Sequence, residues 1–238
     1  MSYTTLHNHS SYSNASLGFP DSINKYDKLI QSAYDLGLNG IAITDHECIS
    51  GHVQALKYYQ SMTKDRPFQL ILGNEIYLLS EDEDSFMNGT SLPFDENGND
   101  NYYANNETPY YHFILNALDN EGHKQIRELS SRAWYRAYTY KGLMRRPTYY
   151  SDLEDIVTPN QGHIIASSAC MGGVIPHAIL DNDIQKAENA IMYFDSIFGH
   201  GNFYLELQPC YEANTEQMLV NKTLWELGHK LDIPCIAT

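Results

Sequence analysis

The chain has 238 residues, of which 42% are hydrophobic and 19% are charged, so it can bury a core and is not disordered by composition. Its net charge of −15 argues against a surface that binds nucleic-acid phosphates over its whole extent. The sequence contains no apolar run of about 18 residues, the length that would predict a membrane span. Its first residues lack the pattern of a secretory signal. Four widely spaced cysteines without a CxxC pair are typical of a reducing compartment, so we expect a cytoplasmic protein.

Short apolar runs alternate with amphipathic stretches along the chain. Strands are predicted at 4–6, 39–43, 69–73, 113–118, 163–167, 203–207 and 233–237. Helices are predicted at 23–36, 50–62, 121–138, 173–180, 184–198 and 214–231. This alternation indicates an α/β protein, either a (β/α) barrel or a doubly wound sheet. Both folds place their sites at the C-terminal ends of the strands.

Two segments have an uneven charge. Residues 80–111 hold eight acidic residues and no Lys or Arg, and they predict an acidic surface loop inserted into the domain. Residues 124–146 hold seven of the fifteen basic residues, together with Trp134, Tyr135, Tyr138 and Tyr140. This segment has two interpretations: a single-stranded nucleic-acid surface, or a helix whose aromatics pack inward and whose charges face the acidic loop. The second is favoured.

Polar side chains follow most of the predicted strands. They are His7 and His9 after the first strand, Asp45 and His46 after the second, Asn74 and Glu75 after the third, Cys170 after 163–167, and Gln208 after 203–207, with Glu206 inside that strand. Alternate residues of an extended segment point the same way, so both imidazoles of His7-Asn8-His9 can reach one ion. Several histidines with carboxylates favour zinc, manganese or iron over calcium. A bridging Glu is typical of two-metal hydrolytic sites.

Six segments resemble the motifs of one family, the PHP (polymerase and histidinol phosphatase) domain. They are LHNHSSYS, AITDHECISG, GNEIYL, HFILNALDNEGHKQI, SACMGGVI and FYLELQ. More specifically, these motifs resemble the N-terminal PHP domain of the bacterial DNA polymerase III alpha subunit. The run EGHKQIRELSSRAWYRAYTYKG is also similar to that subunit. SNASLGFPDSINK resembles the bacteriophage forms. The resemblance implies a distorted (β/α)7 TIM-like barrel, with residues 1–238 forming one PHP domain.

The resemblance also implies a cluster of up to three divalent ions, zinc or manganese. His7, His9 and Glu75 would serve the first ion, and Glu75 would bridge to the second. His112 and Cys170 match ligands of the second ion, whereas Asp21 and His46 match ligands of the third. Asp45 and Glu206 would orient the ligands through hydrogen bonds. In the family the last strand continues into Asn-Asp-x-His, which supplies two further ligands. We therefore expect a fragment that ends before this motif and lacks the polymerase carboxylates.

Three functions remain open at this point. The first is the N-terminal domain of a replicative DNA polymerase, whose own activity would be a metal-dependent phosphoesterase, either a 3′–5′ exonuclease or a pyrophosphatase. Its partners would be DNA, the remaining polymerase domains and a proofreading exonuclease subunit. The second is a catalytically silent module that supports the polymerase. The third is a free-standing phosphatase of the histidinol-phosphatase type, which the segment 124–146 disfavours.

Overall fold

The computed structural model describes residues 3–13, 22–80, 110–140, 143–211 and 213–238. The strands are β1 (Thr4–Thr5), β2 (Gly40–Ile43), β3 (Gln69–Leu79), β4 (Tyr111–Ala117), β5 (Tyr138–Tyr140), β6 (Leu143–Arg145), β7 (Pro147–Tyr149), β8 (Ile164–Ser167), β9 (Phe203–Leu207) and β10 (Cys235–Ala237). The α-helices are α1 (Tyr26–Asp35), α2 (His52–Ser61), α5 (Asn120–Tyr135), α6 (Tyr150–Ile156), α7 (Val174–Leu180), α8 (Ile184–Phe198) and α9 (Thr215–Leu231), with a 3₁₀ turn at Thr158–Asn160.

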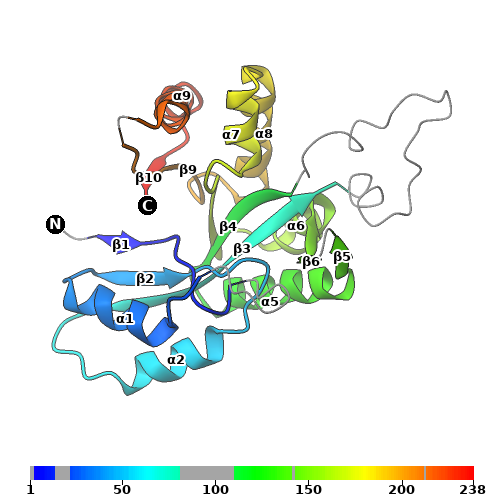
Figure 1. Cartoon of the computed structure of the whole chain (residues 1–238). Coiled ribbons are helices and arrows are strands. Elements are labelled where there is room, and N and C mark those ends of the chain that lie inside the picture. Colours follow the sequence, from blue (N-terminus) through cyan, green and yellow to red (C-terminus); the bar gives the residue numbers. More distant parts are fainter. Residues whose placement is uncertain (1–2, 14–21, 81–109, 141–142, 212) are drawn as a thin grey trace.

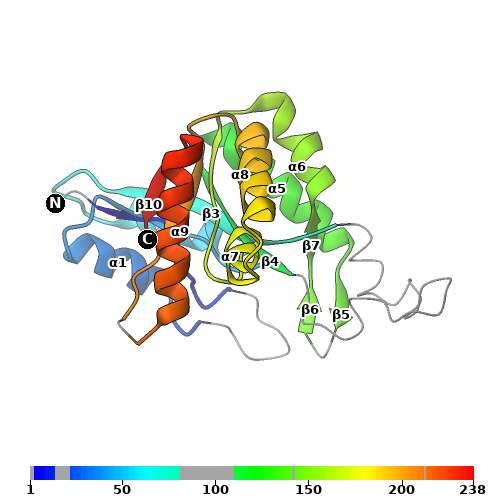
Figure 2. The same ribbon diagram turned by 90° about the horizontal axis from the view of Figure 1, so that it is seen from above.

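One curled sheet organises the domain, with strand order β1-β2-β3-β4-β8-β9-β10 and with β7 also paired to β3. All of these pairings are parallel except the two made by β4, which runs antiparallel to β3 and to β8. The sheet curls so that its first and last strands lie on the same side of the molecule, near both chain ends (Figures 1 and 2). This mixed α/β architecture confirms the expected distorted TIM-like barrel, and β4 and β7 are the distortions.

The helices cover the outer face of the sheet, with α1 and α2 against its first strands and α7, α8 and α9 at the other end (Figure 1). Alternation along β4 explains how one strand serves both faces. Phe113 and Leu115 join the main hydrophobic core, where Phe113 packs against Phe194 with 4.4 Å between ring centroids. His112, the residue before Phe113, points to the opposite face and lines the cavity described below. A second core cluster joins β2 to α1 and α2.

Short polar side chains begin the long helices. The Asp119 carboxylate accepts hydrogen bonds from the backbone N–H groups of Glu121 and Gly122 at the start of α5. Asp183 and Asn214 cap α8 and α9 in the same way. Such caps satisfy N–H groups that have no partner inside the helix. The apolar stripe of α8 located that helix in the sequence, whereas the caps set the first turn of each helix and did not enter the prediction.

The middle of the chain differs from the sequence prediction. The helix predicted at 121–138 ends at Tyr135, and the following residues form β5, β6, β7 and α6, which the sequence analysis did not predict. The strand predicted at 69–73 continues to Leu79. Of the predicted acidic loop 80–111, residues 81–109 lie outside the described part of the chain. Its upper boundary is wrong, because Tyr110 is buried and Tyr111 begins β4, where pairing with β3 outweighs the polar composition.

The segment 124–146 also corrects the favoured interpretation. Trp134 is 45% exposed and Tyr135 is 93% exposed, so these two do not pack inward as expected. Tyr138 does, because it packs against the buried cluster of Tyr77, Leu79 and Tyr110. Arg132 and Arg136 contact Asp152 of α6, and Arg132 also contacts Asp155 there. The ion pairs thus hold α5 to α6. Among the described residues, no helix is both long and apolar enough to span a membrane.

Candidate metal centre

Glu75 lies where the edge of β3 changes neighbours. Residues 69–72 of β3 pair with β2, and residues 77–79 pair with β7 along the same edge. Between them, the loop after β2 takes over: Glu75 N–H donates to the Asp45 carbonyl at 3.2 Å, and Glu47 N–H donates to the Glu75 carbonyl at 2.8 Å. His46 forms an isolated parallel bridge with Glu75. Because β2 and β7 pair with separate parts of this edge, the loop after β2 fills the gap between them and places His46 beside Glu75.

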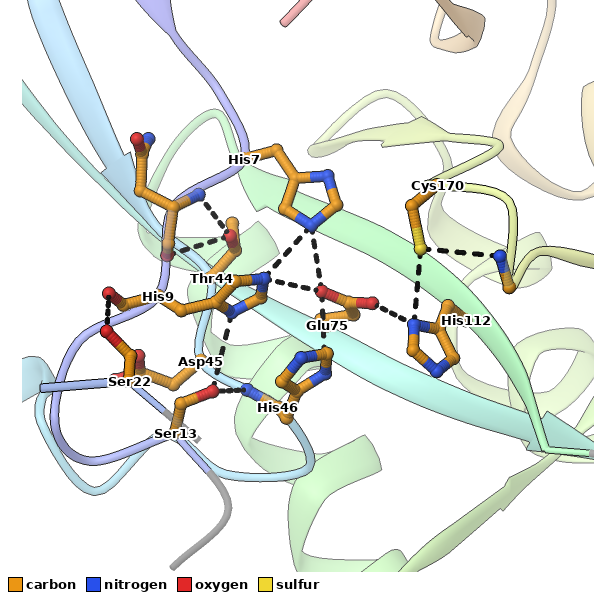
Figure 3. Close-up of polar contacts among 12 residues, drawn as sticks. His7, His9, Ser13, Ser22, Thr44, Asp45, His46, Glu75, His112 and Cys170 are labelled. Atoms are coloured by element: carbon orange, nitrogen blue, oxygen red, sulfur yellow. Dashed lines mark hydrogen bonds and ion pairs between the residues drawn. The ribbon is translucent and has the colours of Figure 1, made fainter. Parts of the chain in front are cut away.

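Four imidazoles surround the fully buried carboxylate of Glu75 (Figure 3). His7 Nε2, His9 Nε2 and His46 Nδ1 lie 2.9, 3.1 and 3.5 Å from Glu75 Oε2. His112 Nδ1 lies 2.6 Å from the other oxygen, Oε1. His112 is the second residue of β4, which runs antiparallel to its neighbours, so it lies at the edge of the sheet where the parallel strands end. This topology explains why a residue at a strand start joins residues from strand ends.

The outer nitrogen of His7 is held by Glu206 of β9. His7 Nδ1 donates to Glu206 Oε1 at 2.7 Å, and a carboxylate can only accept, so His7 Nε2 faces Glu75. Ser167 and Thr238 hydroxyls donate to the same carboxylate at 2.6 and 2.8 Å. A carboxylate behind a histidine commonly fixes the orientation of a metal ligand. Glu206 thus lies where the sequence analysis expected a supporting residue.

Asp45 holds the loop that carries two of the four imidazoles. Its carboxylate accepts the Ser10 N–H at 2.5 Å and the Ser10 hydroxyl at 2.7 Å. The side chain is buried, and burial raises its pKa, although the bonds from Ser10 oppose this shift. Asp45 thereby ties the loop after β1 to the loop after β2. This contact agrees with the supporting role expected for Asp45.

Cys170 approaches the centre from the loop after β8. Its Sγ lies 3.4 Å from His112 Nδ1 and accepts the Gly172 N–H, also at 3.4 Å. Gly172 is required for close packing, because a Cβ there would lie 3.0 Å from the His112 ring. The Gly172 carbonyl accepts the His112 N–H at 2.9 Å. The glycine-rich motif therefore brings the thiol to the imidazole.

The charges of the cluster are strongly coupled. Burial lowers the pKa of His7, but the hydrogen bonds and charges of Glu206 and Glu75 outweigh it and raise that pKa to about 11. Burial likewise lowers the pKa of His112, but Cys170 and Glu75 raise it to about 10. Burial alone would raise the pKa of Glu75, whereas His112, His7, His9 and His46 together hold it well below its usual value. The buried carboxylate therefore attracts cations.

A cavity of about 450 Å³ opens over this cluster. Its lining is His7, His9, His46, Glu75, His112, Cys170, Gln208, Pro209 and Thr238. All six predicted ligands that fall in the described residues thus meet in one place. Asp21, the seventh, lies outside those residues. No Lys or Arg is among the lining side chains that the structure describes, so among these residues only the imidazoles can present positive charge to an anionic ligand.

The donor atoms fit divalent metal ions. Two groups of three residues could each hold an ion: His7, His9 and Glu75 form one, and His46, Glu75 and His112 form the other. Within each group the three ligand atoms lie within 4.8 Å of one another. The Nε2 atoms of His7 and His9 are only 3.1 Å apart, so both cannot carry a proton. Glu75 Oε1 is buried and, within the described chain, accepts no hydrogen bond of normal geometry despite its contact with His112. Imidazole, carboxylate and thiolate ligands suit zinc or manganese better than calcium.

The grouping differs in one respect from the one that the resemblance implies. His46, expected at the third ion with Asp21, lies with Glu75 and His112. The sequence analysis also missed several supporting side chains: Ser10, Ser13, Ser167 and Thr238. The first two belong to the HSSYS segment that follows the histidine pair, which was the available signal. Ser167 ends β8 and Thr238 follows β10, the two strands that flank β9, so their contacts with Glu206 depend on a strand order that the sequence does not reveal.

Comparison with known proteins gives the family directly. The PHP domain family matches residues 5–210, and the chain belongs to it. Among curated relatives, a DNA-directed DNA polymerase of Bacillus phage SPbeta is 35% identical over 92% of this chain. The DNA polymerase III alpha subunits of Borreliella burgdorferi and Aquifex aeolicus are 31% and 30% identical over 98% and 99% of it. The chain spans only 17% to 18% of the length of these relatives.

Proposed function

We propose that this chain is a metal-dependent phosphoesterase domain that cleaves phosphodiester bonds at a 3′ end of DNA. The observation that carries the proposal is the pair of ligand groups that share the buried carboxylate of Glu75. When bound, divalent ions at such a site supply positive charge to a phosphoryl group in its transition state. The absence of Lys and Arg from the described lining makes the reaction depend on that charge.

The residues of the chain have distinct tasks in this proposal. His7, His9, His46, Glu75, His112 and Cys170 would hold the ions. Glu206 fixes the ring of His7, and Asp45 fixes the loop that carries His7 and His9. His9 and His112 have side chains 24% exposed, against 8% for His7, so they form the accessible rim of the cluster. A substrate phosphate would therefore approach between His9 and His112.

The identity of the relatives supports a wider proposal for the protein that carries this domain. We propose that it works with further polymerase domains in template-directed DNA synthesis, and that DNA is its substrate. A proofreading subunit would be an additional partner. Reconstitution of DNA synthesis with and without this domain would test this assignment.

The test of the phosphoesterase proposal compares metal content and hydrolysis in one series. The protein is stripped with a chelator, reloaded with zinc or manganese, and assayed on a 3′-labelled single-stranded oligonucleotide. Glu75→Gln should lose bound metal and reduce hydrolysis by about 100-fold or more. Glu226→Gln is the matched control, because its side chain is 63% exposed and only contacts Lys222. Metal binding without hydrolysis would instead favour the silent module, and equal hydrolysis by Glu75→Gln would overturn the proposal.

A further inference from the structure

Ser13 lies beside the cluster and contacts two of its histidines. Its side chain is fully buried, and its hydroxyl touches one histidine from each ligand group (Figure 3). Ser13 Oγ lies 3.4 Å from His9 Nδ1 and accepts the His46 backbone N–H at 2.8 Å. His9 belongs to the group with His7, whereas His46 belongs to the group with His112. The Ser13 hydroxyl thus connects the two ligand groups by a route that does not include Glu75.

The contact bears on the tautomer of His9. A neutral imidazole has one N–H and one lone pair, and a ligand must present the lone pair to the metal. If His9 binds an ion through Nε2, the nitrogen that faces His7 and Glu75, its hydrogen lies on Nδ1. The His46 N–H occupies one lone pair of Ser13 Oγ, and the other can accept that Nδ1–H. Ser13 is thus placed to hold the His9 ring when the centre is loaded with metal, from the side opposite Glu75.

The surrounding loop keeps this hydroxyl in place. Ser13 N–H donates to the Ser10 carbonyl at 2.9 Å, and Ser10 is itself held by two hydrogen bonds to Asp45. Cys48 Sγ donates to the Tyr12 carbonyl at 2.9 Å. The loops after β1 and β2 are thus joined at Ser10 and Tyr12, just before Ser13. Since Ser13 is buried, a solvent molecule cannot simply replace its hydroxyl from the bulk.

We infer that Ser13 is a positioning residue for both metal-binding groups. It holds the His9 ring with Nε2 toward Glu75, and it fixes the backbone from which His46 reaches Glu75. This inference rests on the proposed metal-dependent function and extends it to a residue that need not touch any ion. It follows that removal of one hydroxyl should weaken the binding of ions at both groups, rather than at one.

The experiment reads the tautomer and the metal affinity separately. Imidazole ¹⁵N spectra of the zinc-loaded protein should show His9 with zinc on Nε2 and hydrogen on Nδ1, and Ser13→Ala should shift the Nδ1–H signal. Zinc titration by calorimetry should then show about 10-fold to 100-fold weaker binding at both steps. Ser13→Thr retains the hydroxyl and should restore most of the affinity. Ser22→Ala is the comparison, because Ser22 donates to the His9 backbone carbonyl and not to its ring.

Each outcome distinguishes the two proposals. If the unaltered protein binds no zinc, the metal-dependent function fails. If it binds zinc but His9 keeps its hydrogen on Nε2, only this inference is overturned, even if Ser13→Ala does not fold. Equal spectral changes in Ser13→Ala and Ser22→Ala would assign the effect to the loop rather than to the hydroxyl. Unchanged zinc affinity at either step in a folded Ser13→Ala would also contradict it.

Discussion

His7 and Glu206 are 199 residues apart, and their side chains meet at 2.7 Å. The contact joins the segment after β1 to β9, near the two edges of the curled sheet. Burial would raise the pKa of Glu206, but His7, Ser167 and Thr238 outweigh it and lower that pKa. The carboxylate therefore stays ionised and keeps the His7 ring turned toward Glu75.

Replacement of Glu206 by Gln should weaken metal binding without removing a ligand. The amide can donate as well as accept, so it no longer dictates which nitrogen of His7 carries the hydrogen. We expect zinc affinity to fall by about 10-fold to 100-fold. Calorimetric titration measures this change, with Glu226→Gln as the exposed control. Unaltered affinity would show that the His7 ring is oriented by other contacts.

The stability of the metal-free protein should fall as the pH rises above neutrality. The pKa of His7 is about 11 in the folded state and 6.5 in the unfolded state, so the folded protein retains a proton that the unfolded chain loses. Its stabilisation is complete below about pH 6.5 and is lost as the pH rises toward 11, by at most about 1.4 kcal/mol per pH unit. Urea unfolding at about pH 7 and about pH 9.5 measures the loss.

Zinc-loaded protein is the control for that pH dependence. A bound ion replaces the proton on the imidazole, so the loaded protein should unfold with a much smaller difference between the two pH values. His7→Gln without metal should also lose part of the dependence. His52 does not interfere, because burial lowers its pKa to about 4 and its titration falls on the acid side. A pH-independent metal-free protein would contradict the proposed coupling.

Cys170 should govern the preference between metals. A thiolate is a soft ligand that favours zinc, whereas manganese prefers oxygen and nitrogen ligands. Cys170→Ser should therefore reduce zinc affinity by about 10-fold or more and leave manganese affinity less affected. Competition titrations with both metals measure the ratio. Cys210→Ser is the matched control, because Cys210 is exposed and lies outside the cavity lining. Equal losses for both metals would show that the thiol does not discriminate.

Phe113 should be a principal contributor to stability. It is 1% exposed and lies among the rings of Phe194, Phe198 and Phe203, with centroids 4.4 to 6.0 Å away. Phe113→Ala should lower the free energy of unfolding by about 3–5 kcal/mol, and Phe113→Leu by about 1 kcal/mol. Denaturant unfolding compares them. A loss below about 1 kcal/mol for the alanine variant would mean that the three remaining rings repack around the cavity.

Gly122 should tolerate no side chain. An added Cβ would lie 1.9 Å from the His163 carbonyl oxygen, so helix α5 could not keep its distance from the segment before β8. Gly122→Ala should therefore lower the free energy of unfolding by about 1–3 kcal/mol, despite the higher helix propensity of alanine. Ser131→Ala on the exposed face of α5 should change it by about 0.5 kcal/mol or less. A stabilised Gly122→Ala would show that the helix shifts freely.

The sequence located most of the regular elements and most of the cluster because both follow simple periodicities. The apolar stripe of α8 and the run at 203–207 gave those elements their observed bounds. The strands of residues 138–149 were missed because each has only three residues, too few to show an alternation. His112 came only from family resemblance, since no local pattern reveals that β4 runs antiparallel. Ser13 was missed because its role depends on loops that meet only after folding.

The change of neighbours at Glu75 gives the sheet an internal weak point. Most sheets fray from their outer strands, but here the middle of β3 depends on a loop, through two backbone hydrogen bonds, for continuity along one edge. Opening of that loop would release the Glu75 amide while β2 and β7 remained paired on either side. Hydrogen exchange at this one amide would therefore report the integrity of the candidate metal centre, independently of global unfolding.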